Sequence, residues 1–260
     1  MMRLIVGPSA YVGRLALSAV GTVGRGGVLA MGAVRAIRKR DIWLPLFVPQ
    51  LAAVGVASVP IGLFIASFTG IVLAIQASYT FTGTVPLYFV GALVGKTIII
   101  ELGPVLTGLA LAGRVGANIA AEVGSMRVTE QIDALESLAY DPIAYLVVPR
   151  VLAGVVMFPI VVALATTAGI AAGWLTSLSL LDLSTPEFVR GLRLFFVPYD
   201  VRFALIKSAS FGLTVTGVGA FFGFTCTGGA EGVGRATTRA VVVSSMIILV
   251  LDAFWAATLL

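Results

Sequence analysis

The sequence predicts an all-α integral membrane protein with an N-terminal interfacial helix and five transmembrane helices. Of its 260 residues, 59% are hydrophobic and only 11% are charged, whereas soluble domains carry about 25% charged residues. Between Ile42 and Ile100 there is no acidic residue, and Lys96 is the only base. Because a transmembrane helix needs about 20 apolar residues, this interval holds at least one span and most of a second.

The residue types that are rare or absent exclude several kinds of site. Histidine is absent, which removes the commonest general base and metal ligand and leaves Ser125 without a histidine to activate it. The single cysteine, Cys226, excludes a disulfide framework and a cysteine-rich metal site. The segment from Gly91 to Thr97 is one residue short of a phosphate-binding loop and lies in an apolar stretch. We therefore predict no catalytic residue, metal site or cofactor in this chain, and no nucleic-acid partner.

Residues 1–43 are predicted to form a basic amphipathic segment in the membrane interface. The first forty residues hold seven bases and no acid, a composition that favours contact with anionic headgroups. Arg14, Ser18 and Arg25 fall near one helical face, although four glycines between residues 21 and 27 are expected to weaken a continuous helix. A basic tail or an organelle transit peptide would have a similar composition.

Residues 44–260 are predicted to form the five-span domain. Hydropathy places the spans at roughly 44–78, 86–121, 146–178, 203–226 and 238–259. A turn at Thr80–Pro86 separates the first two spans, and the loop 179–202 has balanced charge. By the positive-inside rule the N-terminus is cytoplasmic, so five crossings place the 114–150 segment and the 227–237 loop inside and the C-terminus outside. Glycines four residues apart, which permit close helix packing, recur as Gly91/Gly95, Gly169/Gly173 and Gly219/Gly223.

Glu101 is a charged residue well inside the second predicted span. It precedes Pro104, which is expected to loosen or kink the helix. A charge at such depth costs about 2.5–3.5 kcal/mol and therefore faces a cavity or a partner. Lys96 does not share a helix face with Glu101, so Lys207 in the fourth span is the better candidate partner. Such a pair would serve either as structural glue or as part of a substrate path, and the residues favour neither.

The segment from Glu101 to Pro142 holds six of the twelve acidic residues. Its cytoplasmic part, residues 122–142, is predicted to break the second helix at Gly124. Thr129 is then expected to cap a short new helix, with acids in its first turns. That helix has one apolar edge, formed by Ile132, Leu135 and Leu138. It is too short to bury a core of its own, so it either docks on a partner or packs beneath its own bundle.

Several short motifs occur in one order along nearly the whole chain. They are Glu101-Leu-Gly-Pro104, Ala112-Gly-Arg114-Val-Gly116, Ala121-Glu122-Val-Gly124-Ser-Met126, Thr129-Glu-Gln-Ile-Asp-Ala-Leu135, Asp141-Pro142, Pro149-Arg150, Lys207-Ser208 and Gly234-Arg-Ala-Thr-Thr-Arg239. Together these motifs closely resemble the MlaE/YrbE permeases. Those proteins are the membrane subunits of MCE-type ABC transporters, which move lipids between bacterial membranes.

The resemblance implies an assembly and a set of site residues. It implies a homodimer with two cytoplasmic ABC ATPase subunits that bind ATP and Mg, a ring of MCE-domain proteins outside, and a small STAS-like regulatory subunit. It implies a coupling helix at about 122–138 that lies in a groove of the ATPase, with the coupling residues Glu122, Gly124, Ser125, Met126, Thr129, Glu130, Gln131, Asp133 and Leu135. A substrate cavity is implied at the dimer interface, lined mainly by the first and fifth spans, with Glu101 and Lys207 near it. Structural roles are expected for Pro104, Gly113, Arg114, Gly116, Arg235 and Arg239.

On this resemblance the expected protein is a permease subunit in the bacterial inner membrane. It would couple ATP hydrolysis by a partner to the transfer of phospholipid. Two other classes remain open: a stand-alone ion-coupled transporter or channel that uses Glu101 and Lys207 as a relay, and a structural scaffold for the MCE ring. Neighbouring genes for an ATPase and an MCE protein would favour the first class, and lipid bound after purification would argue against the scaffold.

Overall fold

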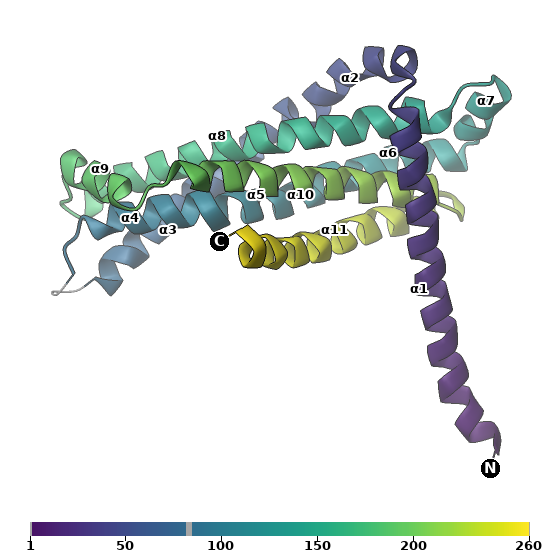
Figure 1. Cartoon of the computed structure of the whole chain (residues 1–260), viewed down its shortest axis with the longest axis horizontal. Helices are drawn as coiled ribbons and strands as arrows, with labels where there is room; N and C mark the ends of the chain where they lie inside the picture. Colours follow the sequence, from purple (N-terminus) through teal and green to yellow (C-terminus); the bar gives the residue numbers. More distant parts are fainter. Residues whose placement is uncertain (1, 82–84, 260) are drawn as a thin grey trace.

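The chain folds into an elongated bundle of helices from which one long N-terminal helix projects (Figure 1). The computed structural model describes residues 2–81 and 85–259, and these ranges contain no strand. The α-helices are α1 Met2–Ala36, α2 Arg40–Val54, α3 Val59–Thr80, α4 Phe89–Thr97, α5 Gly103–Leu111, α6 Ala117–Val128, α7 Gln131–Ser137, α8 Val148–Leu180, α9 Thr185–Leu194, α10 Pro198–Phe224 and α11 Gly229–Leu259. A 3-10 turn, Val56–Ser58, joins α2 to α3, and π-helical turns occur at Ile98–Leu102, Ala112–Gly116 and Ile143–Val147.

The five predicted spans are confirmed, although most of their boundaries differ from those that hydropathy predicts. The helices long and apolar enough to cross a membrane are Arg40–Thr80, Phe89–Val128, Ile143–Leu180, Pro198–Phe224 and Gly229–Leu259. Because α11 already begins at Gly229, the predicted loop 227–237 is mostly helix. The predicted turn at Thr80–Pro86 lies partly outside the described residues, which omit 82–84.

The charged loop 179–202 contains a helix, α9, that hydropathy does not reveal. Ser184 and Glu187 cap the N-terminus of α9, because the Glu187 carboxylate accepts hydrogen bonds from the Ser184 hydroxyl (2.6 Å) and from its backbone N–H (3.0 Å). These two hydrogen bonds lower the pKa of Glu187. Phe188 is buried as α9 packs on α4. The loop is therefore a structured cap over one end of the bundle.

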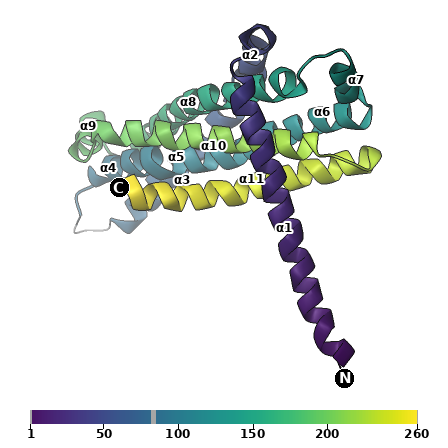
Figure 2. The same cartoon turned by 45° about the vertical axis from the view of Figure 1, so that its right-hand side comes forward.

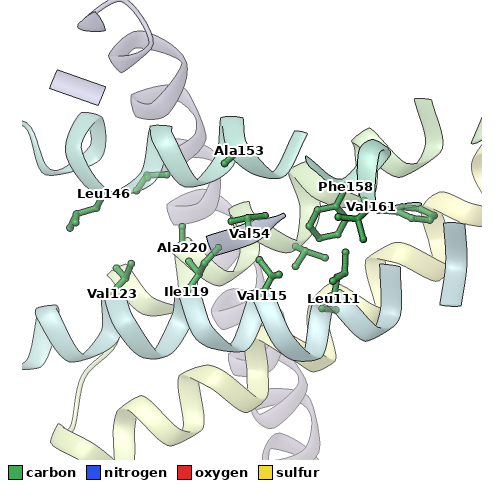
Figure 3. Close-up of a cluster of buried hydrophobic side chains, with 14 of the residues drawn as sticks. Val54, Leu111, Val115, Ile119, Val123, Leu146, Ala153, Phe158, Val161 and Ala220 are labelled. Carbon is green, nitrogen blue, oxygen red and sulfur yellow. The ribbon is translucent and has the colours of Figure 1, made fainter. Parts of the chain in front are cut away.

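The main hydrophobic core lies between the second, third and fourth spans. Side chains four residues apart on the second span point to the same side in Figure 3; they are Leu111, Val115, Ile119 and Val123. They face α8, where Phe158 and Val161 are almost fully buried. A spacing of four residues keeps one helix face against its neighbours over several turns, so this stripe packs α5 against α8 and α6 against α10.

Glycines bring several of the helices into backbone contact. A Cβ atom added to Gly70 of α3 would lie 1.9 Å from the carbonyl oxygen of Gly169 in α8. One added to Gly219 of α10 would lie 2.8 Å from the carbonyl oxygen of Gly116. The close packing predicted for Gly169 and Gly219 is thus confirmed, whereas the role of Gly70 was not foreseen.

The first and fifth spans are the least buried of the five. In the most apolar 18 residues of each, 28% and 17% of the residues are buried, against 44% to 56% in the other three spans. Large apolar side chains on these two spans are exposed, among them Phe64 and Phe68 on α3 and Met246 and Phe254 on α11. These faces therefore contact lipid or another chain.

The helix α1 is continuous over 35 residues, so the expected weakening by its glycines was wrong. Glycine lowers helix propensity without forbidding helical dihedrals, and here it permits a close crossing. A Cβ added to Gly32 would come within 2.8 Å of Ile143, the first residue of the third span. Figures 1 and 2 both show α1 crossing the bundle helices at a large angle near one end, with its N-terminal half projecting away. The side chains of Arg14 and Ser18 lie outside the described part of the chain, and interfacial placement remains a prediction.

Candidate functional site

An ion cluster joins the second, fourth and fifth spans. Lys207 on α10 is fully buried, and its ammonium group donates a hydrogen bond to Glu101 Oε2 at 2.7 Å. The same group forms an ion pair with Asp252 on α11. The Lys207 ammonium also lies 5.3 Å from the centre of the Phe203 ring. The pairing hypothesised for Glu101 and Lys207 is therefore present, with a second carboxylate added to it.

Pro104 shapes the backbone on which Glu101 sits. Instead of a simple kink, the helix forms a π-helical turn over Ile98–Leu102, with Glu101 inside it. Because proline has no N–H, the carbonyl of Ile100, four residues earlier, loses its helical donor. Lys207 donates to that carbonyl oxygen at 3.3 Å. Lys207 thus pairs with the Glu101 carboxylate and also donates to the carbonyl that the proline leaves without a helical donor.

Asp252 was missed by the sequence-based prediction, although its signal was present. It is an acidic residue deep within α11, whose most apolar window meets the hydropathy of a membrane span. An acid in such a position normally faces a partner or a cavity. Its side chain is 16% exposed, whereas that of Glu101 is 40% exposed. The cluster is therefore sealed around Lys207 and open on the side of Glu101.

The segment after the second span departs from its prediction in two places. The helix does not break at Gly124, because α6 continues to Val128 and Gly124 is buried against Gly223 and Cys226. The chain turns at Glu130, which adopts a left-handed conformation with φ of 59°. Thr129 does not cap α7; its hydroxyl donates to the carbonyl of Ser125 at 2.9 Å and so ends α6. The boundary is displaced because Gly124 is packed within a continuous helix and the left-handed turn occurs at Glu130 instead.

The short helix α7 is held to the bundle mainly by one fully buried side chain, and most of its other side chains are exposed. Ile132 is fully buried in the main core and Leu135 is half-buried beside it. Leu138 is 69% exposed, so the predicted apolar edge is divided between the bundle and the surface. The acids Glu130 and Asp133 are exposed, and Asp133 accepts a hydrogen bond from Arg127 at 2.5 Å. Figures 1 and 2 place α7 at the opposite end of the bundle from α9.

The predicted coupling residues divide into three groups by exposure. Gly124 is buried, and Met126 and Leu135 are half-buried against the core. The exposed members are Glu122, Ser125, Thr129, Glu130, Gln131 and Asp133. Glu122 is exposed but is connected to α8, because its Oε1 accepts a hydrogen bond of 2.7 Å from the buried Arg150 of that helix. A displacement of this segment would therefore reach α8 through that ion pair and through Ile132.

The residues assigned structural roles also differ among themselves. Pro104 and Gly116 are buried, whereas Gly113 is exposed and a Cβ there would meet nothing within 4 Å. The glycine in contact is Gly116, one helical turn further on. Arg235 and Arg239 are exposed at the start of α11, and Arg235 donates to Glu231 at 3.0 Å.

Asp141, just before the third span, forms an ion pair with Lys39, just after α1. We predict that the stability contributed by this pair depends on pH. Partial burial would raise the pKa of Asp141, but hydrogen bonds from Lys39 and from the backbone N–H groups of Ala144 and Ile143 outweigh this effect and lower the pKa below its ordinary value of 3.8. A lowered pKa means that the contact stabilises the fold above pH 3.8 and that this stability is lost as the pH falls through the lowered pKa. Thermal unfolding of Asp141→Asn should show a loss of up to about 1 kcal/mol at pH 7. This difference should vanish in strong acid; a difference independent of pH would contradict the assignment.

A cavity of about 690 Å³ lies between α1 and the bundle, bordered by α8, α10 and α11. Its walls are almost entirely apolar, with Leu29 and Val34 on α1 facing Val151 on α8 and Phe221 on α10. It is not lined by the first span, so it is different from the cavity expected between the first and fifth spans of two subunits.

Comparison with known proteins gives a consistent result over the length of the chain. The family model described as "Permease MlaE" matches residues 47–258. The chain is 38% identical over 239 residues to a probable ABC transporter permease protein of Rickettsia felis, covering 92% of each chain. It is 42% identical over 205 residues to a probable ABC transporter permease protein of Synechocystis, covering 79% of this chain and 78% of the relative. It is 33% identical over 250 residues, 96% of each chain, to the intermembrane phospholipid transport system permease protein MlaE of Haemophilus influenzae.

Proposed function

This chain belongs to the MlaE permease family of ABC transporter permeases, and from that premise we propose that it is the membrane subunit through which a partner ATPase drives phospholipid transfer between membranes. The observation that carries the proposal is the match over 96% of each chain to a phospholipid transport permease. The one segment that resembled a phosphate-binding loop lies in α4, where a Cβ on Gly91 would lie 2.2 Å from the Phe188 carbonyl oxygen. That packing leaves no room for a nucleotide, which supports ATP and Mg binding by the partner.

The exposed face of α7 is proposed to receive the ATPase. It combines acidic side chains with the exposed Leu138, which directly follows this helix of seven residues. A helix this short is not stable by itself, so its orientation depends on Ile132 inside the bundle and on whatever covers the other face. Closure of the ATPase would move α7 and, through Glu122 and Arg150, shift α6 against α8.

The substrate cavity is proposed to form between two copies of the chain, at their first and fifth spans. These are the spans whose apolar side chains are least buried within one copy. The half-exposed Glu101 carboxylate would then border the cavity, with Lys207 paired to it from inside the bundle. A homodimer of this kind would accept a ring of MCE-domain proteins on its outer side and a small STAS-like subunit with the ATPase.

The proposed orientation places α7 and the basic N-terminus in the cytoplasm and the C-terminus in the periplasm, in a bacterial inner membrane. The C-terminal end of α1, the turn between α10 and α11, and α7 all lie at one end of the bundle (Figures 1 and 2). Bases at that end include Lys39, Arg40 and Arg235, which fits the positive-inside rule. In this orientation α1 would lie in the plane of the membrane.

Reversing the charges of Glu130 and Asp133 tests the docking proposal. In Glu130→Lys/Asp133→Lys, two repulsive charges replace two acids on an exposed face, so we expect at least about a tenfold loss of ATPase co-purification, equivalent to 1.4 kcal/mol, and loss of lipid transfer. Exposed substitutions usually change stability by no more than about 0.5 kcal/mol, so the bundle should remain folded. Arg193→Glu, on the exposed surface of α9 at the opposite end, is the matched control and should leave both unchanged. Unaltered ATPase binding and transport in the double variant would remove the docking claim, and transport without any ATPase would favour an ion-coupled carrier.

A further inference from the structure

A second, polar cavity lies between the first and second spans, away from the Lys207 cluster. Its volume is about 300 Å³, and its polar lining residues are Gln50 on α2 and Arg114, Asn118 and Glu122 on the second span. Arg114 follows Glu101 by thirteen residues, which corresponds to about 20 Å along a helix. The cavity therefore cannot share a small ligand group with the Lys207 cluster.

Arg114 carries a positive charge for which the described residues supply no acidic partner. Its guanidinium donates a hydrogen bond of 2.5 Å to the hydroxyl of Ser58, a neutral acceptor. By contrast, Lys96, Arg150 and Lys207 each form an ion pair with a carboxylate. A guanidinium has five N–H donors, so most of the hydrogen-bonding capacity of Arg114 is left for the contents of the cavity.

The backbone of the first span positions Ser58 to accept the hydrogen bond from Arg114. Gly55, after α2, packs where a Cβ would lie 1.9 Å from Met157 of α8, and the chain then forms the 3-10 turn Val56–Ser58. In that turn the fully buried Ser58 donates its hydroxyl hydrogen to the carbonyl of Val54 at 2.6 Å. The hydroxyl oxygen is thereby directed to accept from Arg114, which fixes one edge of the guanidinium.

The net charge of the cavity is positive. Glu122 also lines it, but the Oε1 atom of Glu122 accepts a hydrogen bond from Arg150, which balances the negative charge. The uncompensated charge is that of Arg114, flanked by the amide groups of Gln50 and Asn118, which can donate further hydrogen bonds. This is the donor set that suits a tetrahedral oxyanion, since arginine binds phosphate through paired N–H groups.

The depth of Arg114 agrees with the position of lipid phosphates. Arg114 lies 25 residues after Phe89, the start of the second span, or about 37 Å along a helix. The hydrocarbon layer is about 30 Å thick and the bilayer with its headgroups about 40–45 Å. A span that enters the hydrocarbon near Phe89 therefore brings Arg114 into the opposite headgroup layer.

We propose that the polar cavity between the first and second spans binds a phosphate group, with Arg114 as its principal ligand and Gln50 and Asn118 as additional donors. The second carboxylate oxygen of Glu122 would accept a hydrogen bond from an ammonium or hydroxyl group attached to that phosphate. The phosphate is carried either by the headgroup of a phospholipid or by a free anion. The assignment does not depend on ATP-driven transport, since it concerns binding by this chain alone.

The test measures binding to the purified full-length protein by calorimetry, with two probes at equal ionic strength. One probe is dihexanoyl phosphatidylglycerol, and the other is inorganic phosphate; dihexanoylglycerol, which lacks phosphate, is the negative control. Arg114→Gln should weaken binding of the phosphate probe by about tenfold or more, the effect of one charge-assisted contact. Arg127→Gln, in the same span but paired with Asp133 outside the cavity, should leave binding unchanged.

The outcomes distinguish a phospholipid headgroup from a free anion as the source of the phosphate. They also show whether the proposal fails. Arg114-dependent binding of the lipid alone assigns the site to a headgroup, and Arg114-dependent binding of both probes assigns it to phosphate in general. Asn118→Leu keeps the charge of Arg114 but removes one donor, and a loss of about threefold or more in this variant, within the range for one hydrogen bond, supports the site if Arg114→Gln fails to fold. Equal affinity in wild type, Arg114→Gln and Asn118→Leu, or equal binding of dihexanoylglycerol, would overturn the proposal. The charge reversal on α7 tests the transport function independently of these results.

Discussion

Lys207→Met is expected to destabilise the protein by about 3–5 kcal/mol, the usual cost of removing one partner from a buried ion pair. Lys207 is fully buried between Glu101 and Asp252, so its loss leaves two carboxylates facing each other and a carbonyl at Ile100 without a donor. Because total stabilities are about 5–15 kcal/mol, much of the protein should fail to fold. The yield of monodisperse protein and its thermal unfolding temperature measure the effect.

Because Glu101 and Asp252 share Lys207, we expect single and double variants of these two acids to differ in stability. Glu101→Gln or Asp252→Asn alone leaves one ammonium with one carboxylate, so each should cost no more than about 1.5 kcal/mol. The double variant Glu101→Gln/Asp252→Asn leaves Lys207 unpaired and should be as unstable as Lys207→Met. Full stability of Lys207→Met would show that the cluster does not hold these spans together.

The neutral triple variant separates a structural role of the cluster from a role in the substrate path. Glu101→Gln/Lys207→Met/Asp252→Asn contains no unpaired charge, so much of the lost stability should return. If lipid transfer also returns, the cluster acts as structural glue. If the protein is stable and binds its ATPase but does not transfer lipid, the charge of Glu101 acts on the substrate, as its exposed side suggests.

Gly70→Ala is expected to cost about 3 kcal/mol, at the upper end of the range for overpacking. The new Cβ would lie 1.9 Å from the Gly169 carbonyl oxygen, so the helices α3 and α8 must separate to admit it. A backbone atom cannot rotate away as a side chain can, and the contact extends along both helices. Thermal unfolding in one detergent at one protein concentration measures the loss.

Gly113→Ala is the matched control for Gly70→Ala. A Cβ at Gly113 meets nothing within 4 Å, so only helix propensity should change. Alanine is favoured over glycine in a helix by about 0.8–1.0 kcal/mol, so this variant should be as stable as the wild type or more stable. Equal destabilisation by both substitutions would show that helix separation at Gly70 is not the cause.

Local composition correctly predicted the elements that depend on it. It did not predict features that depend on contacts between residues distant in the chain. The spans follow from hydropathy, because a membrane accepts only long apolar helices with satisfied backbone groups. The pairing of Glu101 with Lys207 was predictable because each is a charge in an apolar span. Asp252 carried the same signal and was overlooked. The helix α9 also had a local signal, the capping pair Ser184 and Glu187, but hydropathy does not detect it, and the burial of Phe188 against α4 is decided by tertiary contact.

The end of the second span illustrates the same limit. Gly124 reads as a helix breaker, but its place against Gly223 and Cys226 makes the missing side chain a packing requirement, so the helix continues. Gly113 and Gly116 look equivalent along the chain, yet only Gly116 faces a neighbouring helix. Whether a glycine weakens a helix or allows a neighbour to approach depends on what lies opposite, which is a property of the tertiary structure.

By itself the sequence determined the class of protein, the five spans, the acidic segment between the second and third, and the likeness to lipid permeases. These depend on composition and on motif order, which are local or linear properties. Only the tertiary structure decided that Lys207 serves two acids and a proline-freed carbonyl, that α7 is anchored by Ile132, and that Arg114 faces a polar cavity. The physical reason is that the cost of a charge or the use of a small residue in a membrane depends on its neighbours across the bundle.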